Sequence, residues 1–233
     1  FDYDNDGRLD LFLCSFVEFS AKANIVCGDN KLGRRYYCIP RVFKPTPSVL
    51  FHNNGDGTFT QTSKGTDIER ALGKALGVVA SDVNNDGLTD LFVANDTVQN
   101  FVFHNQRNRT FKEIGAASGI AFDSYGNTRG AMGIDTARYR NDQTLGVAIG
   151  NFANEMTALY VSQKDPLVFT DEAITEGVGP ASRQWLKFGL FFFDYDLDGR
   201  MDLLSVNGHL EEEISKIQKS QRYAQPAQLF WNA

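Results

Sequence analysis

Aspartate residues recur at the same spacing in three short segments of the chain. Each segment, called an Asp loop below, has acidic or amide side chains at positions 1, 3 and 5, glycine at position 6 and aspartate at position 9. Carboxylates at alternate positions converge when a loop curls around one point, and glycine permits the sharp turn. An all-oxygen, highly charged set of ligands is typical of calcium. The pattern therefore predicts one structural calcium ion in each of the three loops.

The predicted ligands are the side chains at positions 1, 3, 5 and 9 and the backbone carbonyl at position 7. They are Asp2, Asp4, Asp6, Arg8 and Asp10; Asp82, Asn84, Asp86, Leu88 and Asp90; and Asp194, Asp196, Asp198, Arg200 and Asp202. Zinc would need His or Cys, and we expect neither near the loops. An EF-hand would need a glutamate at position 12, where this chain has Leu13, Val93 and Ser205. Merely solvated turns are an alternative for one loop, but three copies in register favour metal.

The acidity of the chain is concentrated in these loops. The formal net charge is −6, and 11 of the 29 acidic residues lie in the three Asp loops. The rest of the chain has 18 acidic and 23 basic residues. The negative charge therefore collects where a cation would bind, and the sequence shows no basic patch typical of nucleic-acid binding.

The Asp loops belong to a longer repeat. The second and third loops start 112 residues apart, which is twice 56, so a fourth copy is expected at Arg138. That copy is degenerate, with Arg138 and Arg140 at positions 1 and 3. We expect no metal there. Either guanidinium groups replace the ion by pairing with Asp142 or Asp135, or two arginines are simply exposed on a relaxed loop.

Residues before and after the loops also recur at fixed distances from them. Gly77, Gly133 and Gly189 each lie five residues before a loop, and Asn95, Asn151 and Asn207 each lie 13 residues after its start. The repeats run approximately over 1–76, 77–132, 133–188 and 189–233, and the first carries an insertion at 16–47.

Each repeat reads as four strands. Apolar runs without clean alternation predict strands that are covered on both faces, and four strands in about 55 residues describe a propeller blade. The predicted fold class is all-β: residues 1–233 form one portion of a β-propeller with four-stranded blades. The first repeat lacks its opening strand and the last its closing strand, so we expect missing sequence and a larger ring of about seven blades.

The three cysteines suggest one disulfide. Cys27 and Cys38 bracket a polar loop, whereas Cys14 lies in an apolar run, so we pair Cys27 with Cys38 and expect Cys14 to be a buried thiol. A disulfide together with calcium loops favours a secreted, cell-surface or periplasmic location. No apolar run reaches the ~18 residues that a membrane helix needs.

The Asp loops between strands resemble the FG-GAP/VCBS repeat of integrin α-subunit propellers and of many secreted bacterial proteins. The cartilage-acidic-protein-like group, often linked to an ASPIC/UnbV domain, is a closer match. The segments that carry the resemblance are Cys27-Gly-Asp, residues 34–38, residues 53–59, Met132-Gly-Ile-Asp135, Val206-Asn-Gly-His209 and residues 228–232. The resemblance implies a calcium-bearing, secreted or periplasmic propeller with no activity established.

The strand order places the long connections on the face opposite the Asp loops. We call this the long-loop face, and long loops in compact repeats are usually functional. The insertion offers Arg34, Arg35, Tyr36 and Tyr37 for binding an anionic or protein partner, although it could instead be a lid over a blade edge.

Two functions are compatible with this pattern. The first is a binding module for a protein or glycan that acts through the long-loop face. The alternative is a polysaccharide lyase or hydrolase, for which His209 beside Glu211, Glu212 and Glu213 is the one candidate cluster. A run of this kind is more often the solvated face of a short helix, so an enzyme is the less favoured interpretation.

Overall fold

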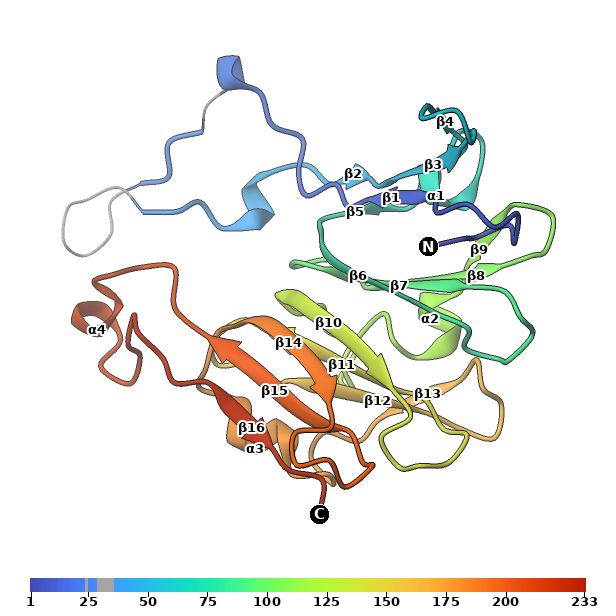
Figure 1. The fold of residues 1–233 in the computed structure, drawn as a ribbon. Coiled ribbons are helices and arrows are strands. Elements are labelled where there is room, and N and C mark those ends of the chain that lie inside the picture. Colours follow the sequence, from blue (N-terminus) through green and yellow to red (C-terminus); the bar gives the residue numbers. More distant parts are fainter. Residues whose placement is uncertain (24, 29–35) are drawn as a thin grey trace.

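The computed structural model describes residues 1–23, 25–28 and 36–233, and these residues form antiparallel β-sheets joined by loops and short helices (Figure 1). The first sheet consists of β1 (Leu11–Leu13), β3 (Val49–Asn53) and β4 (Phe59–Gln61). The second consists of β6 (Ala75–Ser81), β7 (Asp90–Asn95), β8 (Phe101–Asn105) and β9 (Phe111–Glu113). The third consists of β10 (Ala131–Ala137), β11 (Gly146–Asn151), β12 (Ala158–Ser162) and β13 (Phe169–Asp171). The fourth consists of β14 (Lys187–Phe193), β15 (Asp202–Asn207) and β16 (Gln228–Phe230).

Short elements connect these sheets. A small ladder pairs β2 (Thr46–Pro47) with β5 (Leu72–Gly73). The helices are α1 (Asp67–Arg70), α2 (Gly115–Ser118), α3 (Val178–Ser182) and α4 (Ile214–Ile217), with 3₁₀ turns η1 (Ala21–Ala23) and η2 (Pro40–Val42). Among the described residues, no helix has the length and apolar character that crossing a membrane requires.

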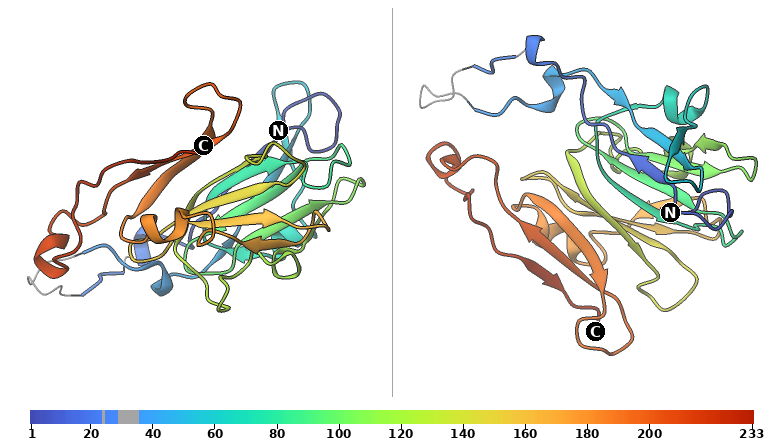
Figure 2. Two further views of the ribbon diagram at one scale, coloured as in Figure 1. Left: turned by 90° about the horizontal axis from the view of Figure 1, so that it is seen from below. Right: turned by 45° about the horizontal axis from the view of Figure 1, so that its top comes forward.

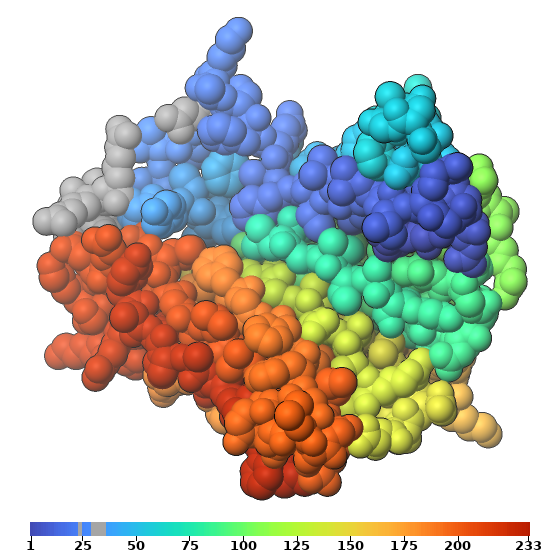
Figure 3. Space-filling view, in the orientation of Figure 1, coloured from blue at the N-terminus to red at the C-terminus, as the bar shows by residue number. Residues whose placement is uncertain are grey.

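The four sheets follow one another in chain order (Figures 1 and 2). The space-filling view shows the blue, green, yellow and orange segments packed against one another (Figure 3). Each is an antiparallel meander, and the first strands of the last three sheets lie together, because β10 packs against both β6 and β14. The all-β prediction is confirmed, and the successive meanders are consistent with propeller blades. The exact repeat boundaries and the larger ring stay predictions.

The hydrophobic core lies between neighbouring sheets. Phe103 and Leu91 of the second sheet pack against Leu50 and Tyr3 of the first repeat, and Phe92 packs against Ile149 of the third sheet. The strands β7 and β11 are buried along their whole length because a sheet covers each of their faces. This arrangement explains their continuous apolar sequence.

Inner-strand glycines allow the sheets to approach each other. A Cβ on Gly77 would lie 2.4 Å from the carbonyl oxygen of Met132, and one on Gly133 would lie 2.5 Å from that of Phe188. Gly189 occupies the same position in the fourth sheet, where a Cβ would meet Val206 at an ordinary 3.5 Å. The repeated glycine is therefore required where another sheet packs against the strand.

The replacement Gly133→Ala tests this explanation, with Gly189→Ala as its matched control. Because backbone cannot move away easily, Gly133→Ala should lower the free energy of unfolding by about 1–3 kcal/mol. The control should be neutral or stabilising by up to about 1 kcal/mol, since alanine restricts the unfolded chain. Urea denaturation measures both, and equal effects of the two replacements would contradict the explanation.

Candidate metal centre

The carboxylate at position 1 holds each Asp loop in its turn. Asp2 accepts hydrogen bonds from the backbone N–H groups of Asp6 (3.2 Å) and Gly7 (2.8 Å). The same pair of bonds is made by Asp82 and by Asp194. The turn places positions 4 and 6 in the left-handed region, with φ of 58° at Asn5 and 83° at Gly7. The glycine at position 6 therefore has the conformational role that the sequence predicted.

The aspartate at position 9 fastens each loop to the third strand of its sheet. Asp90 is 1% exposed; its Oδ2 accepts the backbone N–H of Val83 (3.0 Å), and its Oδ1 accepts that of Asn105 (2.8 Å). Equivalent bonds are made by Asp10 and Asp202. Burial raises the pKa of Asp90, although these bonds and His104 oppose the shift.

The carboxylate at position 3 of the first loop lacks hydrogen-bond donors. The Asp4 side chain is 1% exposed, and neither of its oxygens accepts a hydrogen bond from a described residue. Arg109 Nε approaches Asp4 Oδ2 to 3.2 Å without hydrogen-bond geometry. Oxygens of Asp2, Asp4 and Asp6 lie within 4.8 Å of one another. Because a buried charged acceptor needs a partner, this set of oxygens fits a cation.

The other two loops differ in how many carboxylates they bring together. In the last loop, oxygens of Asp194, Asp196 and Asp202 also lie within 4.8 Å of one another. In the second loop the residue at position 3 is an amide, and Asn84 Nδ2 donates to Asp86 Oδ2 at 3.3 Å. The second loop therefore carries less negative charge than the other two.

Side chains of the third strand reach into the loops, which the sequence did not predict. His52 Nδ1 lies 3.4 Å from Asp4 Oδ2 and 3.3 Å from Asp10 Oδ1, and His104 Nδ1 lies 2.9 Å from Asp90 Oδ1. In the fourth sheet, Trp231 Nε1 donates to Asp196 Oδ2 at 2.9 Å. The expectation that no histidine lies near the loops was wrong. His52 with Asp4 and Asp10 is a group that could also hold a transition metal.

Arginine side chains meet the aspartate at position 5. The Arg200 guanidinium lies 2.6 Å from Asp198 Oδ2, and Arg8 binds Asp6 in the same way. The backbone N–H of Arg200 is the main cause that holds the pKa of Asp198 below its usual range, with burial opposing and the guanidinium adding to the effect. Arg8 and Arg200 therefore contribute charged side chains to the loops, beyond the backbone carbonyl expected at position 7.

The degenerate loop keeps its turn but changes its partners. Asn141 is left-handed, with φ of 55°, as at position 4 of the other loops. The Arg140 guanidinium binds Glu172 (2.5 Å) and Glu176 and lies over the Tyr139 ring. A Cβ on Gly146 would lie 2.7 Å from that ring, so Tyr139 fills the space that the aspartate at position 9 occupies elsewhere.

Of the two alternatives expected for these arginines, pairing with Asp142 or Asp135 is not observed. The Asp142 carboxylate accepts hydrogen bonds from Thr144, and Asp135 accepts the backbone N–H of Phe192 (2.8 Å). Arg138 instead donates to Asn85 Oδ1 of the second loop (2.7 Å). The actual partners lie on segments that the sequence alone does not bring near the loop.

The insertion is closed by the predicted disulfide. Cys27 and Cys38 are bonded, with their Cα atoms 5.2 Å apart. The free Cys14 is half-buried and not fully buried as expected, and burial raises the pKa of its thiol to about 11. Arg34 and Arg35 lie outside the described residues. Tyr36 and Tyr37 are exposed, and the backbone N–H of Tyr37 donates to Glu211 Oε1 at 3.0 Å. The insertion therefore reaches from the first sheet to a segment of the fourth.

The histidine and glutamate cluster does not form an acid–base site in the described structure. His209 is 9% exposed, its Nδ1 accepts the backbone N–H of Glu211 (3.0 Å), and its ring packs edge-on against Phe152. Burial lowers the pKa of His209, with Glu211 opposing. Glu213 pairs with Lys216. These contacts support the interpretation of this segment as structural.

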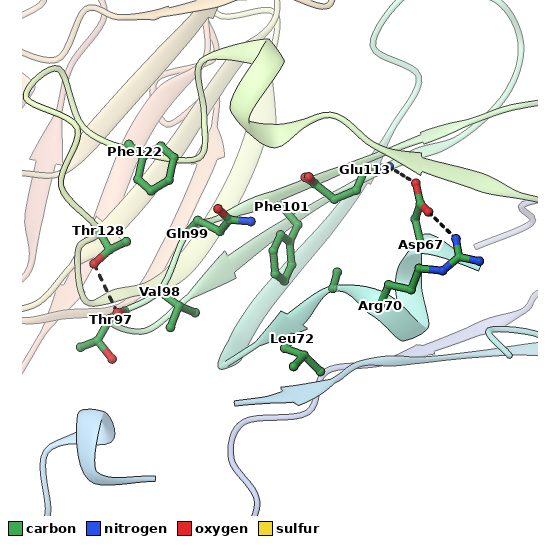
Figure 4. Close-up of a pocket in the computed structure, with 11 residues that line it drawn as sticks. Asp67, Arg70, Leu72, Thr97, Val98, Gln99, Phe101, Glu113, Phe122 and Thr128 are labelled. Atoms are coloured by element: carbon green, nitrogen blue, oxygen red, sulfur yellow. Dashed lines mark hydrogen bonds and ion pairs between the residues drawn. The ribbon is translucent and has the colours of Figure 1, made fainter. Parts of the chain in front are cut away.

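A cavity of about 520 Å³ opens on the long-loop face between α1 and the segments that follow β7 and α2 (Figure 4). Asp67 pairs with Arg70 at its rim and accepts the backbone N–H of Glu113, while Phe101 and Phe122 supply apolar walls. Polar groups beside aromatic rings are suited to binding a polar ligand such as a sugar or peptide.

Repeated antiparallel sheets with an Asp loop between the first two strands define a class of repeat proteins. A family model described as "FG-GAP-like repeat" matches residues 2–93 and 82–149, and the chain belongs to this family. The chain is similar to cartilage acidic protein 1 of Homo sapiens and of Mus musculus, at 26% identity over 176 residues in each case. These matches cover 70% of the chain and 24% and 25% of the relatives, so the chain spans about a quarter of their length. Cartilage acidic protein 1 of Xenopus tropicalis is 27% identical over 139 residues, covering 58% of the chain and 18% of that protein.

Position 4 of the last loop offers a test of the loop conformation. Leu197 is 87% exposed and left-handed, with φ of 61°, where its Cβ is strained. Because asparagine tolerates this conformation, Leu197→Asn should raise the free energy of unfolding by about 1 kcal/mol. The converse replacement Asn141→Leu, at the same position of the degenerate loop, where the side chain makes no hydrogen bond with a described residue, should lower it by a similar amount. Chemical denaturation measures both, and a loss of stability in Leu197→Asn would refute the conformational argument.

Proposed function

We propose that the chain is an extracellular binding module in which calcium fixes the Asp loops on one face and a protein or glycan binds the opposite, long-loop face. The observation that carries the metal part is the Asp4 carboxylate, which is buried without a hydrogen-bond donor among the described residues. Residues at positions 1, 3, 5 and 9 would hold the ion, and its charge would offset the repulsion between their carboxylates.

The loops are connected to the packing of neighbouring sheets. Asn105 of the second sheet donates to the carbonyl of Tyr3 in the first loop (2.7 Å), and Asn232 of the fourth sheet donates to that of Tyr139 in the degenerate loop (2.7 Å). Asn5 of the first loop donates to Gly87 of the second (2.9 Å). An ion that orders a loop would therefore also stabilise the contact between sheets.

The location outside the cytosol is supported by the Cys27–Cys38 disulfide. Disulfides persist in oxidising compartments, where calcium is also abundant enough to fill sites of moderate affinity. The role of the long-loop face is supported by the cavity at α1 and by the insertion, because both lie where the long connections gather.

Removing calcium should destabilise the protein. A site filled at 100 times its Kd adds roughly 3 kcal/mol to the folded state, so a chelator should lower Tm by roughly 6–12 °C per site. Asp4→Asn should reduce this difference, while its melting in chelator should be no lower than that of the unchanged protein. Asp142→Asn in the degenerate loop is the control and should leave the difference intact. An unchanged melt in chelator would contradict the metal proposal.

Binding at the long-loop face can be tested with arrays of glycans and candidate proteins. A ligand of this face should lose at least tenfold in affinity when Arg70→Ala and Gln99→Ala are introduced at the cavity shown in Figure 4. The control is Lys164→Ala, on a turn of the Asp-loop face. Equal losses from the control, or none from the two cavity variants, would place binding elsewhere.

A further inference from the structure

A second cavity, of about 460 Å³, lies beneath the insertion. Its roof comes from the insertion, including Tyr37, Pro40 and Phe43, and its base from the inner strands, including Leu76, Met132 and Phe188. The described part of the insertion lies on the same side of the molecule as α4 (Figure 1), and the Tyr37–Glu211 hydrogen bond connects it with the segment before α4. The walls are mainly apolar and aromatic, and the volume is that of a small-molecule site.

Two carboxylates converge on the wall of this cavity. Asp96 follows β7 and Glu155 follows β11, at corresponding connections of the second and third sheets. Asp96 Oδ1 would lie 3.3 Å from a Cβ on Gly130, and Glu155 Oε2 would lie 3.6 Å from the same point. A Cβ there would also lie 2.8 Å from the Cβ of Phe152, so glycine is required where the two carboxylates and Phe152 meet.

The two carboxylates differ in their partners. Glu155 Oε2 accepts the backbone N–H of Gly130 at 2.8 Å. The Asp96 residue is only 8% exposed, lines the cavity, and its carboxylate accepts no hydrogen bond from the described residues. A carboxylate that lines a cavity and accepts nothing from the described residues is free to accept a hydrogen bond from a molecule in that cavity.

Three nearby cations are directed to other acceptors, and Arg41, which also lines the cavity, forms no ion pair with a carboxylate of the described residues. Lys74 Nζ donates to the Pro40 carbonyl (2.6 Å), and Lys187 Nζ donates to the carbonyls of Glu155 (2.7 Å) and Ser182 (3.0 Å). Arg129 pairs with Asp123 at 3.1 Å. A donor for the Asp96 carboxylate would therefore come from the contents of the cavity.

We propose that this cavity binds a small organic ammonium ion with an apolar body, whose N–H groups donate to Asp96 and whose apolar part contacts the aromatic walls. The Asp96 carboxylate would bind the positively charged group of the ligand, and the apolar walls would contact the rest of it. This site is separate from the Asp loops and adjoins the cavity at α1, with which it shares Thr97, and it does not depend on the calcium proposal.

The charges around the cavity give this binding a pH dependence. Burial raises the pKa of Asp96 to about 6, with Glu155 adding to the shift and Lys74 opposing it. Burial also raises the pKa of Glu155, which faces Arg129, Lys187 and Asp123, and lowers that of Lys187 to about 7. As the pH falls from 7.5 to 5, Asp96 gains a proton and Lys187 becomes charged. Both changes weaken the binding of a cation.

The probe is 2-phenylethylamine, with 2-phenylethanol as its uncharged analogue, titrated into the calcium-loaded protein at pH 7.5 by calorimetry. The amine should bind at least tenfold more tightly than the alcohol, and Asp96→Asn should reduce amine affinity at least tenfold. Asp142→Asn, a remote exposed carboxylate, should have no effect. Amine affinity should fall at least fivefold at pH 5.

Equal affinity for amine and alcohol, or unchanged amine binding by folded Asp96→Asn, would overturn the proposal. If Asp96→Asn fails to fold, Leu76→Trp provides a second variant, because it fills the cavity without removing a charge. Loss of amine binding in Leu76→Trp would support the site, and full binding would refute it. Repeating the titration in chelator, with folded protein, separates this result from that of the metal proposal.

Discussion

A buried carboxylate at position 9 of the Asp loop connects three parts of the structure around the second repeat. Asp90 accepts one backbone N–H from its own loop and one from the third strand of its sheet. The Asn105 side chain at the end of that strand then donates to the loop of the preceding sheet. The direction of these hydrogen bonds is fixed, because a carboxylate can only accept. Loop, strand and neighbouring sheet are therefore positioned together.

The degenerate repeat shows what this constraint requires when the carboxylate is absent. Gly146 stands at position 9, and the Ser162 hydroxyl on the third strand accepts the backbone N–H of Leu145 (2.8 Å). Tyr139 fills the vacant space, and Arg140 is held by Glu172 and Glu176 beyond the loop. The turn itself persists at Asn141. The backbone of the loop is thus a property of the fold, whereas the charged ligand set is the part that varies between repeats.

The repeat register, the sheet class and the disulfide could be predicted from the sequence because each depends on local spacing. The glycine at the position of Gly133 and the aspartate at the position of Asp90 recur in other repeats, and Cys27 and Cys38 are close along the chain. The contacts of His52 and Trp231 could not be predicted in the same way, because they depend on strand register across a sheet. Periodicity could show that His52 and His104 are equivalent, but not that both face a carboxylate.

Contacts between repeats were the least predictable. Arg140 forms an ion pair with Glu172, and Tyr37 donates a hydrogen bond to Glu211, which lies 174 residues further along the chain. Both contacts depend on how the sheets are placed in space. The cavity beneath the insertion arises from the same placement, since its roof and its base come from different repeats. Sequence motifs identify the loops, but the packing of sheets creates the long-loop face.

The most direct test of the central claim is the metal content of dialysed protein, determined by mass spectrometry after exposure to equal calcium and zinc. The account predicts calcium at about one ion per Asp loop, with no further ion from the degenerate loop at Arg138. Calcium below two ions per chain would contradict it. So would zinc in place of calcium, which would assign His52, Asp4 and Asp10 to a transition metal.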